Sequence, residues 1–316
     1  MENPTVYLGC DAHKKECVFC GLNEEGNRVW EGKTPTCLAG FEFVKGKLEG
    51  YIVKVVVEAG GFVWKITDLF SEVGFQVYVC NPSKNPQIGL SRKKTDKEDA
   101  FKLADLLRAG YLKCIYIPTK EQRELRSVSR DRHSLGRLRG RLLTQARTAS
   151  YEHQIERRKR IIECVDDEIK SLKKEITANA GKNPSIRLLD STPGIAEYGA
   201  NLIVGEICTI DRFPTCKQYI AYCGLVPSVR QSGNTLHLGA IRKDSNHRLK
   251  WVYTQSAWIA VRWNQELRRL YDRKARERGK KKAIIVVAKK LATRNYWMLK
   301  ENKTYQELVA AFIRIG

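Results

Sequence analysis

A continuous β-branched run, "YIVKVVVEAGG" at residues 51–61, is the feature that most limits how this chain can fold. Such a strand has no polar face, so it belongs in the centre of a sheet that is covered on both sides. Around it, residues 5–115 alternate strand and helix signals in the order βββαβαβα. We therefore expect an α/β domain over residues 1–117, with a meander first and parallel crossovers after it.

Acidic residues occupy informative places in this domain. Asp11 follows the first strand and Glu58 ends the buried one, and the functional crevice of an open α/β sheet lies outside the carboxyl ends of its strands. Asp96 and Asp99 lie in a helix-capping sequence that begins at Thr95, where the positive helix terminus alone would favour acids. Four converging carboxylates repel one another unless a divalent cation neutralises them, so the sequence predicts a metal site.

Residues 118–182 are expected to form helical arms. Two sets of aliphatic residues there alternate spacings of three and four, which is typical of a coiled coil or an antiparallel helical hairpin. The two sets are Leu135, Leu138 and Leu142, and Ile162, Val165, Ile169, Leu172 and Ile176.

Net charge is the most informative feature of the composition. Lys and Arg number 57 against 35 Asp and Glu, which gives a formal net charge of +22. Such a field favours a polyanion, and nucleic acid is the expected one. Between residues 120 and 160, thirteen basic residues accompany five acidic ones. A solvated helix face would explain this excess equally well, but the planar guanidinium groups of Arg137, Arg139 and Arg141 suit phosphates.

Several classes of protein fit the sequence poorly. The ten cysteines form no disulfide framework, which suits a reducing compartment. Cys17 and Cys20 have CxxC spacing, but residues three apart in a strand point to opposite faces and chelate poorly. No apolar run approaches the ~18 residues of a membrane span, and we see no secretory signal. We therefore expect a cytosolic protein that does not bind a membrane.

Residues 183–316 are expected to be mainly helical and to contain two binding motifs. "STPGIAEYGANLIVGEI" resembles a helix-hairpin-helix whose turn at Gly194 offers backbone amides to a phosphate, although any helix pair can use Pro-Gly. A basic, glycine-rich segment follows, with Ser232 beside Gly233 in a loop or short hairpin. Ser-Gly is usually only a turn. The cations expected to hold a phosphate around it are Arg230, Arg242, Lys243, His247 and Arg248.

Taken together, these motifs resemble the DEDD-type transposases of bridge-RNA-guided insertion sequences, which are relatives of the Piv invertase. The resemblance covers nearly the whole chain, through "GCDAHK", "VVVEAGG", "NPSKNPQIGLSRKKTDKEDAFKLADLLR", "STPGI", "CGLVPSVRQSGN" and "LGAIRKDSNHRLK". "KTDKEDA" together with "GLVP…SG" is its most specific part. Gly60, where Thr is common, and Ala12-His13 are small departures that remove neither a carboxylate nor the serine.

The resemblance implies a RuvC-like domain of RNase H type, in which Asp11, Glu58, Asp96 and Asp99 bind Mg²⁺ or Mn²⁺. It implies a C-terminal domain in which Ser232 attacks a DNA phosphate and is held covalently. A structured noncoding bridge RNA would pair with double-stranded donor and target DNA. The chain would act as a tetramer, a dimer of dimers, with the serine domain of one subunit completing the carboxylate site of another and the arms serving assembly.

Other interpretations of the same residues stay open. A metal-dependent junction nuclease of RuvC type would use the four acids without Ser232. A non-enzymatic nucleic-acid-binding protein would need neither, and a sugar-kinase-like ATPase would not need so basic a chain. His237 and His247 are candidate bases for the serine, but activation by the metal site is preferred, and Ser228 is the obvious alternative nucleophile.

Overall fold

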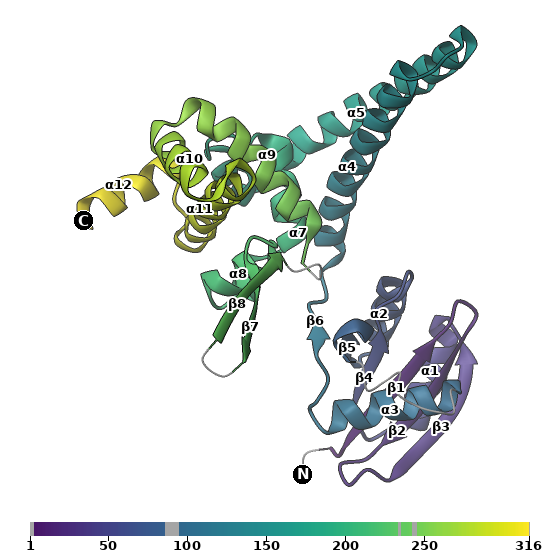
Figure 1. Ribbon diagram of the computed structural model, residues 1–316. Coiled ribbons are helices and arrows are strands. Elements are labelled where there is room, and N and C mark those ends of the chain that lie inside the picture. The colour runs from purple at the N-terminus through teal and green to yellow at the C-terminus, as the bar shows by residue number, and fades with distance from the viewer. Residues whose placement is uncertain (1–2, 86–94, 233–234, 242–244, 316) are drawn as a thin grey trace. The chain divides into compact units, whose positions relative to one another are not determined.

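The computed structural model describes residues 3–85, 95–232, 235–241 and 245–315. The chain divides into two compact units, residues 1–117 and residues 118–316, which are considered separately below (Figure 1). The residues expected to form arms share the second unit with the rest of the chain. Among the described residues, no helix is both long and apolar enough to cross a membrane.

A six-stranded mixed sheet in the order β3-β2-β1-β4-β5-β6 forms the first unit. Strand β1 pairs antiparallel with β2 and parallel with β4, and β4 pairs parallel with β5, which confirms the predicted meander and crossovers. A short strand, β6, adds to the predicted order. The elements are β1 (Thr5–Ala12), β2 (Glu16–Leu22), β3 (Arg28–Pro35), α1 (Leu38–Lys47), β4 (Ile52–Glu58), α2 (Val63–Glu72), β5 (Gln76–Cys80), the 3₁₀ turn η1 (Pro82–Lys84), α3 (Asp96–Arg108) and β6 (Cys114–Ile115).

Side-chain alternation along the strands separates two cores, one on each face of the sheet. Val55 and Val57 of β4 pack with Phe41 in the core beneath α1 and α2, whereas Val56 packs with Leu103 of α3. The β-branched run is therefore buried on both sides, as its composition predicts.

The α3 face of the sheet has room for the helix because β1 carries a glycine there. A Cβ atom on Gly9 would lie 1.9 Å from the carbonyl oxygen of Ala100 and 2.7 Å from the amide nitrogen of Ala104. Any side chain at this position would push α3 away from β1. The glycine thus fixes how closely the first turns of α3 approach the end of β1.

The two cysteines of the CxxC pair lie where strand geometry predicts. Cys17 belongs to the core on the α1 and α2 side, and Cys20 belongs to the small core beneath α3. Because the two thiols lie on opposite faces of β2, they do not form a chelating pair.

The second unit begins with a long antiparallel helical hairpin, α4 (Lys120–Arg147) and α5 (Glu152–Lys182) (Figure 1). Leu142, Ile162 and Val165 are buried between the two helices, with Leu135 and Ile169 packed against them. The helical hairpin predicted from the three- and four-residue spacing is confirmed.

The remainder of the second unit is mainly helical, with one β-hairpin, and its core includes a hydrogen bond between the buried hydroxyls of Tyr219 and Tyr253. It contains α6 (Pro184–Asp190), α7 (Glu197–Ile207), the 3₁₀ turn η3 (Ile210–Arg212), α8 (Cys216–Tyr222), β7 (Pro227–Ser232), β8 (Thr235–Ile241), α9 (His247–Trp263), α10 (Gln265–Arg278), α11 (Lys280–Glu301) and α12 (Tyr305–Ile315).

A buried carboxylate joins the arms to this helical body. Glu206 of α7 is fully buried and accepts two hydrogen bonds from Arg130 of α4, at 2.7 and 2.9 Å. It also accepts one at 2.7 Å from the amide of Asn246, whose own side-chain oxygen caps the N-terminus of α9. Burial opposes ionisation, but these hydrogen bonds and the charge of Arg130 leave the pKa of Glu206 below its usual value.

Removing Arg130 is expected to destabilise the second unit strongly. Arg130→Ala leaves the Glu206 carboxylate buried without its cation, which costs about 3–5 kcal/mol in comparable pairs. Because the pKa of Glu206 is lowered in the folded chain, the loss should be largest at neutral pH and shrink as the pH falls through that pKa. Urea unfolding at several pH values measures it. A matched control is Arg139→Ala, whose partner Asp166 is not fully buried, and equal destabilisation by both variants would contradict the prediction.

Candidate active site

Two of the predicted acids lie at neighbouring strand ends. Strands β1 and β4 run parallel and in register, and Asp11 and Glu58 each follow the last residues that pair between them. Two residues earlier, Gly9 and Val56 both face α3. Since side chains two apart along a strand share a face, Asp11 and Glu58 also belong to the α3 face of the sheet.

The other two acids lie in the first turn of α3. The hydroxyl of Thr95 accepts a hydrogen bond from the amide of Glu98 at 3.3 Å, so the predicted N-cap is present. Asp96 precedes the buried Ala100 by one helical turn, which places it on the side of α3 that packs on the sheet. Asp99 is half-buried. The helix therefore brings its acidic first turn to the edge where β1 and β4 end.

Three side chains come together closely enough at this edge to share one metal ion. Single ligand atoms of Asp11, His13 and Asp96 all lie within 4.8 Å of one another. The Nε2 atom of His13 lies 3.3 Å from an oxygen of Asp11 and 3.5 Å from an oxygen of Asp96. Oxygen and imidazole donors in this arrangement fit a divalent cation.

Electrostatics at the cluster agree with its geometry. Burial raises the pKa of Asp11, His13 partly opposes the rise, and the charges of Asp96 and Asp99 add to it. Asp99 is therefore near enough to repel Asp11, although it lies outside the three-residue cluster found among the described residues. A bound cation would remove this repulsion between like charges.

The cluster at the sheet edge differs from the predicted set of metal ligands at two residues, Glu58 and His13. Glu58 is placed beside Asp11 by strand register, but it is outside the tightest cluster of described residues. Burial raises the pKa of Cys80 on β5, and the charge of Glu58 adds to that rise. His13 was not among the predicted ligands. Its position two residues after Asp11, just beyond the end of β1, was the signal that could have identified it.

The predicted nucleophile lies on the β-hairpin of the second unit. Ser232 is the last residue of β7 and pairs with Thr235 of β8, on either side of residues 233–234, which lie outside the described part of the chain. The predicted hairpin is present, while the orientation of the Ser232 hydroxyl is not described. Ser228 lies at the other end of β7, where its hydroxyl packs against the backbone of Gly239.

The predicted phosphate-binding cations come from different parts of the second unit. On α4, Arg137 and Arg141 line one cavity, whereas Arg139 turns to α5 and forms two hydrogen bonds with Asp166. Arg230 of β7 pairs with His237 of β8, which places that histidine in a strand. Arg242 and Lys243 lie outside the described residues, and His247 and Arg248 line the same cavity as Arg137.

Backbone conformation and packing explain why a glycine occupies position 194. Gly194 adopts a φ of +80°, and a Cβ atom there would lie 2.3 Å from the carbonyl oxygen of Ser256 on α9. Close packing therefore requires glycine at this turn, and Glu197 already places a carboxylate in the first turn of α7. Phosphate binding by the turn stays a prediction.

Comparison with known proteins defines the class as transposases. A family model for the DEDD transposase of IS110 matches residues 8–149, and a second, described as the transposase IS116/IS110/IS902 family, matches residues 186–272. The first match contains all four predicted acids, and the second contains Ser232.

Individual relatives agree with the two family models. The transposase for insertion sequence element IS1111A of Coxiella burnetii is 22% identical over 338 residues, covering 95% of this chain and 91% of that protein. The transposase for insertion sequence element IS1533 of Leptospira borgpetersenii is 30% identical over 148 residues, covering 44% of this chain and 42% of its own length. This chain belongs to the IS110 family of transposases, which are DNA recombination enzymes, and its DEDD-type domain implies dependence on a divalent metal.

Proposed function

We propose that this transposase cuts and rejoins donor and target DNA through a phosphoseryl intermediate on Ser232, with Mg²⁺ or Mn²⁺ held by Asp11, Asp96, Asp99 and Glu58. The observation that carries the proposal is the convergence of Asp11 and Asp96 with His13 at one sheet edge. The strand order β3-β2-β1-β4-β5 supports a RuvC-like assignment of RNase H type for the first unit.

The residues at the sheet edge fit a divalent cation. Two carboxylates and one imidazole already share a space of metal-site size, and burial, together with the like charges of Asp96 and Asp99, raises the pKa of Asp11. When bound, the cation would neutralise charge on the scissile phosphate and on the leaving oxygen. The protein's own part is to hold the carboxylates at one edge through the strand ends and the capped first turn of α3.

The serine step is a transesterification that conserves the energy of the phosphodiester. The Ser232 hydroxyl would attack a backbone phosphorus and form a new P–O bond, while the bond from phosphorus to a deoxyribose oxygen breaks. The hydroxyl proton leaves serine and the released sugar oxygen gains one, so no water is consumed. Attack by the hydroxyl of another strand then reverses the step and joins the DNA, which a hydrolytic nuclease would not do.

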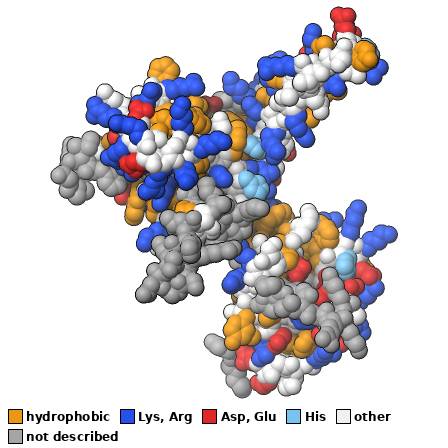
Figure 2. All heavy atoms as spheres, in the orientation of Figure 1, with side chains coloured by type: hydrophobic (Ala, Val, Ile, Leu, Met, Phe, Trp, Pro, Cys, Tyr) orange, Lys and Arg blue, Asp and Glu red, His pale blue; other side chains and the backbone are white. Residues whose placement is uncertain are grey.

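In this proposal a guide RNA selects the DNA sequence, and the transposase acts as a homotetramer. A basic chain can hold a paired duplex by its backbone while base pairing reads the sequence. Basic side chains gather over the arms and over α10 and α11 in Figure 2, which supports a large nucleic-acid surface. In the tetramer, the serine domain of one subunit would serve the carboxylate site of another, with the arms as assembly elements.

Sequencing of RNA that co-purifies with the protein tests the guided part of this proposal. We expect one abundant structured RNA, and we expect recombination of donor and target plasmids only when that RNA is supplied. Changing its pairing segment should redirect insertion to the matching target. Efficient insertion after complete removal of RNA would contradict guidance while leaving the transposase activity intact.

A further inference from the structure

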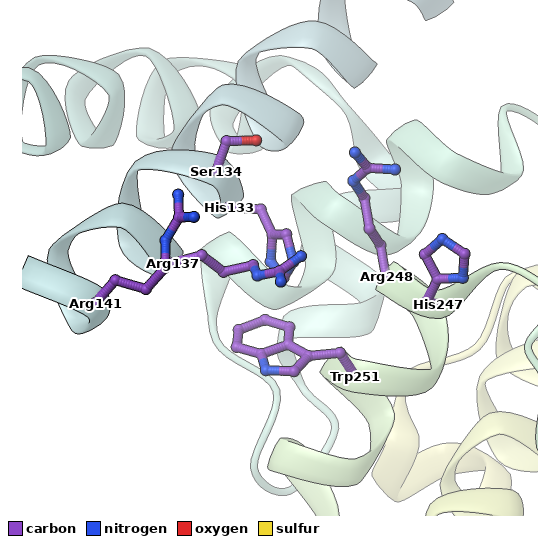
Figure 3. Close-up of a pocket in the computed structure, with 7 residues that line it drawn as sticks. All are labelled: His133, Ser134, Arg137, Arg141, His247, Arg248 and Trp251. Atoms are coloured by element: carbon purple, nitrogen blue, oxygen red, sulfur yellow. The ribbon is translucent and has the colours of Figure 1, made fainter. Parts of the chain in front are cut away.

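A cavity of about 550 Å³ opens between arm helix α4 and helix α9 of the second unit (Figure 3). Arg137 and Arg141 enter it from α4, and His247 and Arg248 enter it from α9. Trp251 lies beside them. None of the described residues that line the cavity is acidic. Its size is in the range of small-molecule and nucleotide sites.

The cavity is strongly electropositive. Burial lowers the pKa of His133 at its inner wall, and the charges of Arg248 and Arg137 lower it further. Positive charges this close to an imidazole oppose its protonation, and an anion bound in the cavity would relieve the repulsion among them. The Nε atom of Arg248 is buried and makes no hydrogen bond within the described part of the chain, and the nearest Glu206 oxygen is 4.0 Å away.

Trp251 supplies a rigid aromatic surface beside these cations. Its ring meets that of His133 edge to face, with centroids 4.6 Å apart, and it also contacts Tyr198 at 6.4 Å. The hydroxyl of Tyr198 lies 3.4 Å from Nδ1 of His133, so the three rings support one another. Trp251 nevertheless stays 40% exposed. A fixed, exposed indole next to arginines suits a stacked base followed by a phosphate.

A hydrogen-bond network centred on Glu206 positions the cations that enter the cavity from α9. Glu206 is neutralised by Arg130 and holds Asn246, and Asn246 caps α9 immediately before His247 and Arg248. The same carboxylate therefore fixes α4 to the start of α9. In the part of the chain that the structure describes, the hydrogen bonds to this carboxylate come from Arg130 and Asn246, whereas Arg248 lies 4.0 Å from it.

We propose that this pocket binds an unpaired nucleotide of a single-stranded nucleic acid, with its phosphate on Arg137, Arg141 and Arg248 and its base against Trp251. The proposal rests on the proposed function only in taking nucleic acid as the partner. A paired base would not fit, because its faces are covered by its neighbours in the duplex. The strand can come from RNA or from opened DNA, since both present the same phosphate and base.

Binding of labelled oligo(dT), oligo(U) and a DNA duplex to the full chain in EDTA tests the pocket. Trp251→Ala should weaken single-strand binding about tenfold, the size expected for one lost stacking contact, and leave duplex binding nearly unchanged. Trp251→Phe should keep most of the affinity but lose part of the oligonucleotide-induced quenching of tryptophan fluorescence. The ratio of the oligo(dT) and oligo(U) affinities tells which strand the pocket prefers.

Arg137→Ala and Arg139→Ala form a matched pair, because both remove one guanidinium from α4 and only Arg137 lines the cavity. Arg137→Ala should weaken single-strand binding more than Arg139→Ala does. Equal effects of the two, equal loss of single-strand and duplex binding in Trp251→Ala, or wild-type quenching in Trp251→Phe would each overturn the proposal. None of these readouts requires strand cleavage, so the pocket and the proposed recombination can fail independently.

Discussion

Asp11→Asn is expected to abolish recombination, with a loss of about 10³-fold or more. Asp11 is the residue common to every observation at the sheet edge: it ends β1, meets His13 and Asp96, and is repelled by Asp99. An amide keeps the shape of the side chain but contributes no negative charge to a cation. Losing several kcal/mol of charge stabilisation at the phosphate accounts for an effect of this size. Strand exchange in vitro with supplied Mg²⁺ measures it.

Asp11→Asn is also expected to change thermal stability, which can be measured without an activity assay. Because the pKa of Asp11 is raised in the folded chain, its ionised form destabilises the folded state at neutral pH, and Asn removes that penalty. In EDTA the melting temperature of Asp11→Asn should therefore equal or exceed that of the wild type. Added Mg²⁺ should raise the melting temperature of the wild type and raise that of the variant less.

Asp105→Asn is the matched control for Asp11→Asn. It also replaces one aspartate by asparagine in the first unit, but Asp105 pairs with Arg108 of the same helix, and both side chains are partly exposed. Such exposed pairs contribute little to stability. The control should retain recombination and a wild-type response to Mg²⁺. Recombination at the wild-type rate by Asp11→Asn would remove this residue from the site.

The fold of the first unit could be predicted because its signals are local. The run at residues 55–57 is apolar on both faces of its strand, which leaves it only a central position. Capping by Thr95 and the glycine after α3 mark the ends of that helix. Strand β6 was missed because Cys114 and Ile115 form only two residues of strand, too short for any periodicity.

Residues of the site were harder to predict than its elements. Asp11 and Asp96 are distant in sequence, and their approach depends on Gly9 letting α3 lie against β1. Strand alternation predicts that His13 can lie on the same side as Asp11, but a histidine just outside a strand often has no role in a functional site. Composition also cannot distinguish Arg139, which bonds to Asp166 of α5, from Arg137, which lines a cavity, because the difference depends on the helical face that each residue occupies.

Buried polar networks also escaped prediction from the sequence. Glu206 lies in an otherwise apolar helix, where its cation is 76 residues away in Arg130. A carboxylate within such a run requires a partner, but nothing local identifies which of the many arginines supplies it. The sequence likewise does not show that Trp251 lies beside the arms, because the cavity that it lines is created by tertiary packing between α4 and α9.

Ser232→Ala is expected to abolish both the covalent protein–DNA adduct and recombination. The serine is the last residue of β7 and pairs with Thr235 of β8. Gly233 follows it in the sequence, and a glycine lets a backbone approach a phosphate closely. Without the hydroxyl there is no oxygen to form the phosphoseryl bond, so the loss should reach the detection limit. Binding of RNA and of duplex DNA should stay unchanged, because alanine removes no charge. Adduct trapping on a suicide DNA substrate in a denaturing gel measures the covalent step.

Ser228→Ala provides the matched control on the same strand. Ser228 packs against Gly239 of the neighbouring strand, so its hydroxyl has a structural place at the end of β7 away from Ser232. This variant should form the adduct and recombine. If the adduct persists in Ser232→Ala, or disappears only in Ser228→Ala, then Ser232 is not the nucleophile. If neither variant nor the wild type forms an adduct while DNA is still cut in Mg²⁺, cleavage is hydrolytic and the junction-nuclease interpretation replaces the phosphoseryl one, because a four-acid metal site can activate water without any serine.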